Sequence, residues 1–174
     1  MSGINYDLTA IRGVVFDVDG VLSPSTIPMG ADGQPMRMVN IKDGYALQLA
    51  VKCGLKIAII TGGDSEAVRV RFNGLGITDV YLKASRKLEV LGEWMHRNGF
   101  NSVDVAYVGD DIPDYEAMRA VGLSVAPADA DALIRRTAVY VSPVEGGYGV
   151  GRDLLEQILK AQGKWTLDER AFGW

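Results

Sequence analysis

The chain has 174 residues, with 22 acidic and 18 basic side chains that give a net charge of -4 and argue against nucleic acid as its main partner. Hydrophobic residues make up 48% of the chain and charged residues 23%, which excludes overall disorder and predicts one globular domain over residues 1–174. The single Cys53 excludes an intrachain disulfide, and the lack of a signal-peptide pattern or a long apolar run predicts a cytoplasmic protein.

Short β-branched runs alternate with helical patterns along most of the chain. The runs predict buried strands at residues 13–16, 56–60, 80–82, 104–108 and 139–141. Helices are predicted at residues 45–52, 65–75, 86–98, 113–120 and 152–162, and several are followed by a glycine that suits a helix C-cap. Repeated strand-helix-strand units joined by short loops predict an α/β, Rossmann-like fold, in which a doubly wound parallel sheet has helices on both faces.

One segment, residues 23–39, breaks this alternation. It is rich in Pro, Gly, Ser and Met, and Asp32-Gly33 stands between the semi-apolar stretches 26–29 and 36–39. Because Asp-Gly suits turns that need a positive φ, the segment predicts a β-hairpin that projects from the sheet. An irregular surface loop is the alternative.

Carboxylates and a hydroxyl follow three of the predicted strands. Asp17 and Asp19 follow the first strand, Thr61 and Gly62 the second, and Asp110 the fourth. Ligands bind beyond the carboxyl ends of the strands in an open parallel sheet, so we expect these side chains to meet at one edge. Like charges crowded there require a cation. Oxygen ligands without His or Cys predict a hard ion, magnesium, with Asp110 as one ligand.

The same residues suit the hydrolysis of a phosphate ester. Asp17 is placed to attack phosphorus and form an aspartyl-phosphate, and Asp19 to protonate the leaving oxygen and then activate water. Thr61 can donate a hydrogen bond to a phosphoryl oxygen, while Lys87, early in the helix after the third strand, can pair with the nucleophile and the phosphate. Support for the metal is expected from Asp111 or Asp114. The alternative is an inert domain in which these residues only cap helices and form turns.

The order of these motifs is more specific than any one of them. Asp-x-Asp-Gly-Val, an apolar strand with Thr-Gly, a lysine, and an apolar strand with Gly-Asp-Asp together resemble the haloacid dehalogenase superfamily of phosphohydrolases across nearly the whole chain. Its four motifs correspond to Asp17/Asp19, Thr61, Lys87 and Asp110. The resemblance implies that the Asp17 side chain, the Asp19 backbone carbonyl and the Asp110 side chain hold the metal. The presence of Asp19 favours phosphatases over dehalogenases.

The intervals between these motifs are too short for the cap domain that many members of this superfamily carry. Catalysis benefits from a water-poor pocket, so an open site needs another cover. We therefore expect a homo-oligomer in which residues 23–39 contact a neighbouring subunit and complete its site. The C-terminal tail, about residues 163–174, contains Trp165 and Trp174, and we expect it to dock on a neighbour, with a frayed terminus as the alternative.

Finer features resemble the capless family of 3-deoxy-D-manno-octulosonate 8-phosphate phosphatases, namely segments 40–45, 68–77 and 106–111. The resemblance implies a magnesium-dependent tetramer that releases a sugar acid for lipopolysaccharide synthesis. It implies substrate contacts from Asp19, Asn40, Ile41, Lys42, Asp43, Gly44, Gly62, Arg71 and Lys87, and arginine grips carboxylates by two parallel hydrogen bonds. Departures at Gln48, Gly63 and Tyr148 leave open a nonulosonate 9-phosphate or another small sugar phosphate as the substrate. A non-catalytic oligomeric scaffold that has kept the fold is the alternative from a different class.

Overall fold

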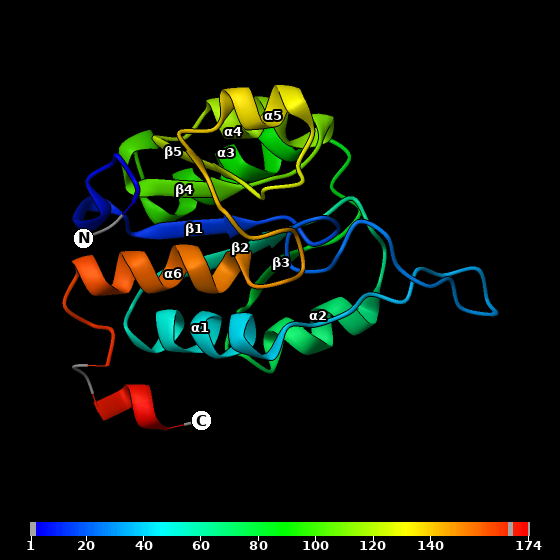
Figure 1. Cartoon of the computed structure of the whole chain (residues 1–174), viewed down its shortest axis with the longest axis horizontal. Helices are drawn as coiled ribbons and strands as arrows, with labels where there is room; N and C mark the ends of the chain where they lie inside the picture. The colour runs from blue at the N-terminus through cyan, green and yellow to red at the C-terminus, as the bar shows by residue number, and fades with distance from the viewer. Residues whose placement is uncertain (1–2, 167–168, 174) are drawn as a thin grey trace.

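A parallel sheet forms the centre of the protein in this computed structural model, which describes residues 3–166 and 169–173 (Figure 1). The strand order is β3-β2-β1-β4-β5-β6, and each neighbouring pair is parallel. The strands are β1 (Gly13–Phe16), β2 (Lys56–Ile60), β3 (Asp79–Tyr81), β4 (Val105–Val108), β5 (Leu123–Ala126) and β6 (Tyr140–Val141). The chain fills one side of β1 with β2 and β3, then crosses to β4 on the other side.

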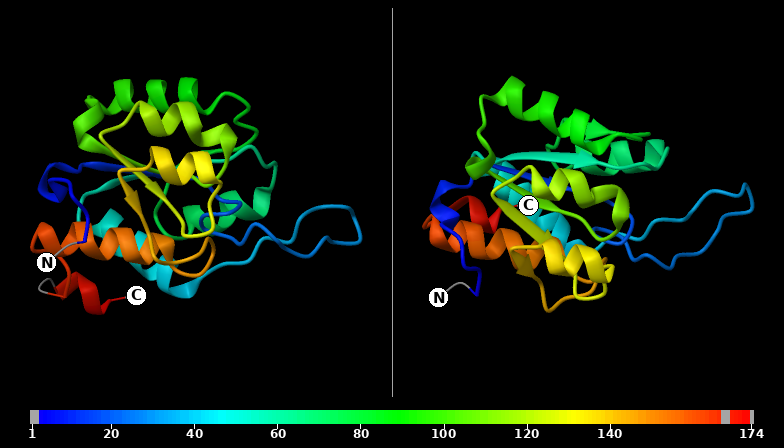
Figure 2. Two further views of the ribbon diagram at one scale, coloured as in Figure 1. Left: turned by 45° about the horizontal axis from the view of Figure 1, so that its top comes forward. Right: turned by 90° about the horizontal axis from the view of Figure 1, so that it is seen from above.

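Helices cover both faces of this sheet (Figures 1 and 2). One face carries α1 (Ile41–Lys52), α2 (Glu66–Asn73) and α6 (Val150–Ala161), and the other carries α3 (Lys87–Asn98), α4 (Tyr115–Arg119) and α5 (Ala132–Thr137). Short 3-10 turns are η1 (Leu8–Ala10), η2 (Ser102–Asp104), η3 (Ile112–Asp114) and η4 (Glu169–Phe172). The doubly wound α/β architecture predicted from the sequence is confirmed. Within the described residues, no helix is long and apolar enough to cross a membrane.

Strand residues alternate between two hydrophobic cores because successive side chains point to opposite faces of a sheet. Val14 and Phe16 of β1 join the core beneath α1, α2 and α6, whereas Val15 joins the core beneath α3, α4 and α5. All four residues of β1 are buried. A strand covered on both faces needs a continuous apolar run, and this is why β1 could be read directly from the sequence.

The structure contains two elements that the sequence pattern did not predict. Strand β5 was missed because Ser124 interrupts a short apolar run, although its hydroxyl is buried and donates to the Thr137 carbonyl. Helix α5 was missed because it is only six residues long. Helix α1 begins four residues earlier than predicted, since the Asn40 side chain accepts hydrogen bonds from the backbone N–H groups of Lys42 and Asp43.

Residues 23–39 project from the sheet as an arm (Figures 1 and 2). Its two sides are joined by hydrogen bonds from Gly30 N to Gln34 O and from Met36 N to Pro28 O, both 2.8 Å, and by one antiparallel bridge between Met29 and Pro35. The arm is therefore hairpin-like, as predicted. Its ladder is too short for regular strands, because Pro28 and Pro35 have no N–H to donate.

The described part of the C-terminal tail packs on its own chain, so Trp165 is covered without a neighbouring subunit; docking of the tail on a neighbour stays a prediction. Trp165 is buried, with its ring edge-on to Tyr45 and the Arg152 guanidinium 4.5 Å from its centroid. The Tyr45 hydroxyl also donates to the Ala171 carbonyl. Helices α1 and α6 thus supply the apolar cover that Trp165 needs. Trp174 lies outside the described residues.

Candidate active site

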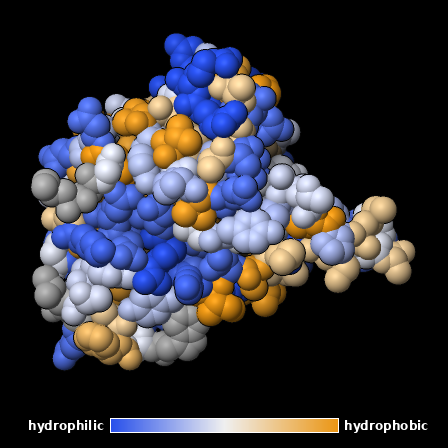
Figure 3. Space-filling view, in the orientation of Figure 1, coloured by the Kyte–Doolittle hydropathy of each residue, from blue (hydrophilic) through white to orange (hydrophobic). Residues whose placement is uncertain are grey.

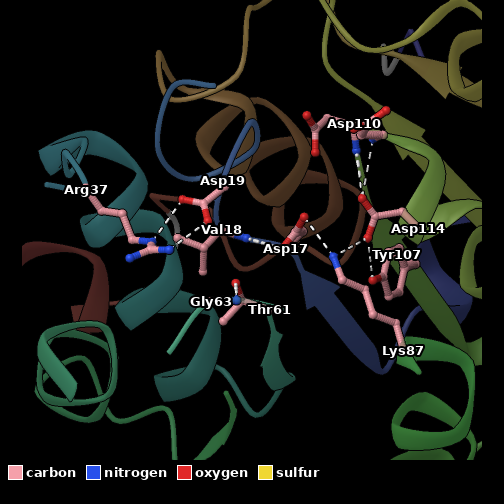
Figure 4. A network of polar contacts seen from close by, with 11 residues as sticks. Asp17, Val18, Asp19, Arg37, Thr61, Gly63, Lys87, Tyr107, Asp110 and Asp114 are labelled. Carbon is pink, nitrogen blue, oxygen red and sulfur yellow. Dashed lines mark hydrogen bonds and ion pairs between the residues drawn. The ribbon is translucent and has the colours of Figure 1, made fainter. Parts of the chain in front are cut away.

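The carboxyl ends of β1, β2 and β4 bring the predicted catalytic residues to one edge of the sheet (Figure 4). Asp17 directly follows β1, Thr61 follows β2, and Asp110 lies two residues after β4, while Lys87 is the first residue of α3. This edge is also where the chain crosses from one side of β1 to the other. Such a topological switch point is the usual ligand site of an open α/β sheet.

A buried lysine lies between two carboxylates in this cluster. The Nζ atom of Lys87 is 2.8 Å from Asp17 Oδ2 and 2.8 Å from Asp114 Oδ1, and the three side chains are only 5%, 9% and 1% exposed, respectively. Burial raises the pKa of Asp17 to about 7, with a contribution from the charge of Asp114, while Lys87 opposes the increase. Lys87 therefore favours the ionised carboxylate that a nucleophile requires.

Asp114 holds the lysine and the loop after β4 in place. Its Oδ1 accepts hydrogen bonds from Lys87 and from the Tyr107 hydroxyl, both 2.8 Å, and its Oδ2 accepts the backbone N–H of Asp110 at 3.1 Å. Asp111, the other candidate support, is exposed. Tyr107 was not among the residues predicted for the site. The available signal was a tyrosine inside an apolar strand, because a buried phenol needs a hydrogen-bond partner.

The acids at this edge fit a hard divalent cation. One carboxylate oxygen from each of Asp17, Asp110 and Asp114 lies within 4.8 Å of the other two. Burial raises the pKa of Asp110 to about 8, and the neighbouring acids add to the increase. A cation would relieve this repulsion. The resemblance assigns the side chains of Asp17 and Asp110 to the metal. Both oxygens of Asp114 accept hydrogen bonds from the surrounding residues, which suits a supporting role.

Glycine lets the two loops that carry these acids approach each other. Gly20 has a φ of 84°, in the left-handed region, and a Cβ atom there would lie 1.9 Å from Asp110 Oδ2. On the other side of the site, Thr61 is buried and its Oγ1 accepts the Gly63 N–H at 3.1 Å. Among the described residues no acceptor takes the Thr61 hydroxyl hydrogen, so it can donate to a phosphoryl oxygen as predicted.

The Asp19 side chain points away from the other acids and toward the arm (Figure 4). Arg37 of the arm binds it in a fork, with Nε to Oδ1 and Nη2 to Oδ2 both 2.9 Å. Arg37 was not predicted for the site, because nothing in the local sequence pattern distinguishes it from other arm residues. With its side chain engaged in this way, Asp19 has its backbone carbonyl left for the metal, as the resemblance implies.

A cavity of about 570 Å³ lies next to these residues, between the arm and α2. Its wall includes Val18, Leu22, Arg37, Val39, Asp64 and Arg71. Apolar side chains with a few charged groups are typical of small-molecule sites, and the volume is within the usual range. Arg71, predicted to contact the substrate, therefore borders a space of suitable size. Gly62, which directly follows Thr61, is exposed.

Comparisons with known proteins agree with this geometry. Residues 56–153, more than half of the chain, match the haloacid dehalogenase-like hydrolase family. The 3-deoxy-D-manno-octulosonate 8-phosphate phosphatase KdsC of Escherichia coli K12 is 42% identical over 159 residues, which cover 91% of this chain and 84% of the relative. The chain belongs to the KdsC family of haloacid dehalogenase-like hydrolases. This confirms the resemblance drawn from the four motifs.

Solved structures of related phosphatases have the same fold as this hydrolase. The crystal structure of 3-deoxy-D-manno-octulosonate 8-phosphate phosphatase from Yersinia pestis matches with a TM-score of 0.87 and 39% identity, covering 91% of this chain and 85% of that one. The enzyme from Moraxella catarrhalis, solved with magnesium, phosphate and KDO, matches with a TM-score of 0.86 and 32% identity, covering 90% of each chain.

The structure places the predicted substrate segment Asn40–Gly44 at the start of α1, apart from the acid cluster. Asn40 caps the helix, Ile41 and Lys42 are exposed, and Gly44 lies against Arg71, whose Nη2 is 2.4 Å from the position of a Cβ there. In this hydrolase the first turn of α1 therefore supports Arg71. Direct contact between this segment and the substrate stays a prediction.

Asp43 of the same segment is buried between α1 and α6. Its Oδ1 accepts the Arg152 N–H at 2.6 Å and so caps α6. Its buried Oδ2 has no hydrogen-bond partner among the described residues. Burial raises the pKa of Asp43 to about 6, partly offset by the contact with Arg152. The folded hydrolase thus keeps a proton on Asp43 at pH values where the unfolded chain has lost it.

We expect Asp43→Asn to remove one pH dependence of stability. The folded pKa is raised, so protonation of Asp43 stabilises the wild type at low pH, and this contribution is lost as the pH rises from about 4 through 6. The asparagine is neutral throughout. The free energy of unfolding of the variant relative to wild type should therefore increase by about 1–2 kcal/mol between pH 4.5 and 7.5. Urea unfolding at both pH values measures it, and a pH-independent difference would contradict this account.

Proposed function

We propose that this hydrolase is a magnesium-dependent phosphomonoesterase that converts 3-deoxy-D-manno-octulosonate 8-phosphate to the free sugar acid and phosphate. The observation that carries the proposal is the convergence of Asp17, Lys87 and Asp110 at one sheet edge, in a chain 42% identical to KdsC. A cluster of buried acids is costly for folding. Phosphoryl transfer explains the cluster, because this reaction needs a carboxylate nucleophile and a cation next to the phosphate.

Phosphoryl transfer starts at Asp17 in this proposal. One carboxylate oxygen of Asp17 attacks phosphorus, the bond between phosphorus and the sugar oxygen breaks, and Asp19 donates a proton to that oxygen. Lys87 keeps Asp17 ionised through the 2.8 Å contact, and the Thr61 hydroxyl donates to a phosphoryl oxygen. The product of this step is an aspartyl-phosphate together with the free sugar acid.

Hydrolysis of the aspartyl-phosphate regenerates the site. Asp19, now ionised, accepts a proton from water, whose oxygen attacks phosphorus while the bond to Asp17 breaks and phosphate is released. Magnesium would be held by the side chains of Asp17 and Asp110 and the backbone carbonyl of Asp19. When bound, it neutralises the acids and polarises the phosphoryl group. Asp114 keeps Lys87 and the β4 loop in position throughout.

One cation on the cavity wall, Arg71, suits the acid group of a sugar acid phosphate. Such a substrate carries a carboxylate and a phosphate, and Arg71 offers a planar cation that suits a carboxylate. We infer that Arg71 binds the acid end of the substrate while the phosphate lies next to Asp17. Gly62, exposed and directly after Thr61, is expected to contact the phosphate end. This assignment makes the carboxylate the group that selects the substrate.

Phosphate release from a panel of esters tests the function. With magnesium, we expect kcat/KM to be highest for 3-deoxy-D-manno-octulosonate 8-phosphate, lower for a nonulosonate 9-phosphate, and lowest for arabinose 5-phosphate, which lacks a carboxylate. Chelation with EDTA should abolish turnover, and added magnesium should restore it. Preference for the nine-carbon ester would favour the alternative substrate, and no release from any ester would indicate a non-catalytic scaffold.

We infer further that the arm joins copies of this chain into a tetramer that closes the site. The arm stands clear of the body (Figure 3), and it exposes Met29, Met36, Met38 and Val39, followed by Ile41 at its base. Apolar side chains gathered on a projection suit an interface between subunits. Light scattering should give four times the 18.8 kDa chain mass, and Met29→Asp/Met36→Asp should lower it. A monomeric wild type would refute the tetramer.

A further inference from the structure

We propose that Arg37 is a positioning residue for the reaction, which orients the carboxylate of Asp19 for proton transfer to the leaving group. The inference rests on the proposed phosphatase function, because it assumes that Asp19 is the acid and base. It adds a residue from the arm to a site otherwise built from the sheet edge. Arg37 thereby makes the proton-transfer step depend on the arm.

The contact between Arg37 and Asp19 has the geometry of a specific pairing. Two parallel N–H···O bonds of 2.9 Å fix both the position and the plane of the carboxylate. The Arg37 side chain is only 11% exposed, whereas that of Asp19 is 41% exposed. Among the described residues, Arg37 is the only one that donates a hydrogen bond to the Asp19 side chain. Without it, the carboxylate is free to rotate in solvent.

The base of the arm fixes Arg37 relative to the turn that carries Asp19. Ser23 is buried, and its Oγ accepts the backbone N–H of Met38 at 3.0 Å. The Ser23 carbonyl accepts the Gly20 N–H at 2.8 Å, and Asp19 and Ser23 form an isolated bridge. Ser23 thus connects the turn at Asp19 and Gly20 to the backbone at Met38, next to Arg37. The pair does not rely on the exposed tip of the arm.

A glycine on the far side of the site makes room for this arginine. A Cβ atom on Gly63 would lie 2.4 Å from Arg37 Nη2 and 3.1 Å from its Cζ. Gly63 does not have a left-handed φ, so its backbone accommodates alanine. Because the group in the way is the end of a flexible side chain, Gly63→Ala should displace the guanidinium while the rest of the fold is kept. Gly63→Ala therefore disrupts the contact between Arg37 and Asp19 while the arginine is kept.

A residue that positions a general acid matters most when the leaving group needs a proton. Phenolate is a poor leaving group and benefits from protonation, whereas p-nitrophenolate is stable as an anion near neutral pH. Phenyl phosphate and p-nitrophenyl phosphate have similar shapes and neither carries a carboxylate, so loss of a substrate contact would lower both rates alike. The value of kcat/KM depends only on the steps up to aspartyl-phosphate formation. The later role of Asp19 as a base therefore does not affect it.

The test compares Arg37→Ala and Gly63→Ala with wild type on these two esters. General acid catalysis contributes roughly 10²–10⁴-fold, so partial loss of it should lower kcat/KM for phenyl phosphate by roughly 10–30-fold. For p-nitrophenyl phosphate the decrease should stay within about threefold. The double variant should be no worse than Arg37→Ala, because both changes remove one interaction. Arg136→Ala, at an exposed position on α5, is the charge-matched control and should change neither rate.

Equal losses on the two esters would overturn the proposal, and so would unchanged rates in Arg37→Ala. Thermal melts establish that each variant is folded, and Arg37→Ala alone decides the question if Gly63→Ala does not fold. A wild type that hydrolyses neither ester nor any sugar phosphate would overturn the proposed function, and with it the role of Arg37. The two failures are therefore distinguishable, because only the second affects the wild type.

Discussion

Asp17→Asn should abolish phosphate release while the fold is retained. Asparagine keeps the side-chain oxygen that accepts the Val18 N–H at 2.7 Å, and Lys87 keeps its contact with Asp114. The amide, however, cannot attack phosphorus. Loss of a covalent nucleophile should lower kcat by roughly 10⁴-fold or more. Phosphate release in the presence of magnesium measures the loss, and circular dichroism establishes the fold.

The same substitution should change stability without magnesium only slightly, because two effects oppose each other. Lys87 loses one of its two carboxylate partners but keeps Asp114. The substitution also removes one of the buried charges that raise the pKa of Asp110, so less repulsion remains among the acids. Glu93→Gln, which neutralises an exposed acid on α3, is the matched control and should affect neither activity nor stability. Turnover by Asp17→Asn within tenfold of wild type would refute the assignment of Asp17 as nucleophile.

Lys87→Met should damage both stability and activity. The substitution leaves Asp17 and Asp114 facing each other without the ammonium that lies 2.8 Å from each. Removing one partner of a buried ion pair costs about 3–5 kcal/mol, because the remaining charge is buried and unpaired. Urea unfolding at pH 8 without magnesium should show this loss. Phosphate release should also decrease by roughly 10²-fold or more, since a cation next to the phosphoryl group is gone.

The loss of stability in Lys87→Met should depend on pH in a defined direction. Lys87 lowers the pKa of Asp17, which burial otherwise raises, so the substitution raises that pKa above its present value of about 7. A raised carboxylate pKa means that protonation stabilises the folded state at low pH, and this is lost as the pH rises. The destabilisation should therefore be smaller at pH 5.5 than at pH 8.

A second substitution separates charge from packing in this experiment. Lys87→Met/Asp17→Asn removes one unpaired carboxylate, so it should recover part of the stability lost at pH 8 but none of the activity. Lys56→Met, at an exposed position of β2, is the control for loss of a lysine charge. Equal destabilisation of Lys87→Met at both pH values would show that the loss comes from packing, contrary to the ion-pair account.

The core of this site could be predicted because residues that directly follow parallel strands lie at the same edge of the sheet. Asp17, Thr61 and Asp110 each follow a buried apolar strand, so their meeting at one edge follows from the fold. Lys87 was predictable for the same reason, as the first residue of the helix after β3. The substitutions at Asp17 and Lys87 test their catalytic roles.

Contacts made across long loops leave no comparable signal in the sequence. Arg37 reaches Asp19 from an arm without regular strands, so no periodicity relates the two residues. Asn40 and Asp43 were predicted as substrate ligands from the family resemblance, and in the structure they cap α1 and α6. A cap and a ligand require the same side chains. Only the three-dimensional neighbours distinguish the two uses.

The nucleophile and the acid-base group belong to parts of the molecule with different resistance to local opening. Asp17 follows β1, which pairs with β2 and β4, and its own N–H donates to the Val108 carbonyl. Amide protons there should exchange with solvent only on global unfolding, whereas those of the arm should exchange through local fluctuations. Changes in the arm can therefore alter which leaving groups are protonated efficiently, without disturbing the Asp17 carboxylate. Divergence of substrate range within such a scaffold has a natural starting point in this segment.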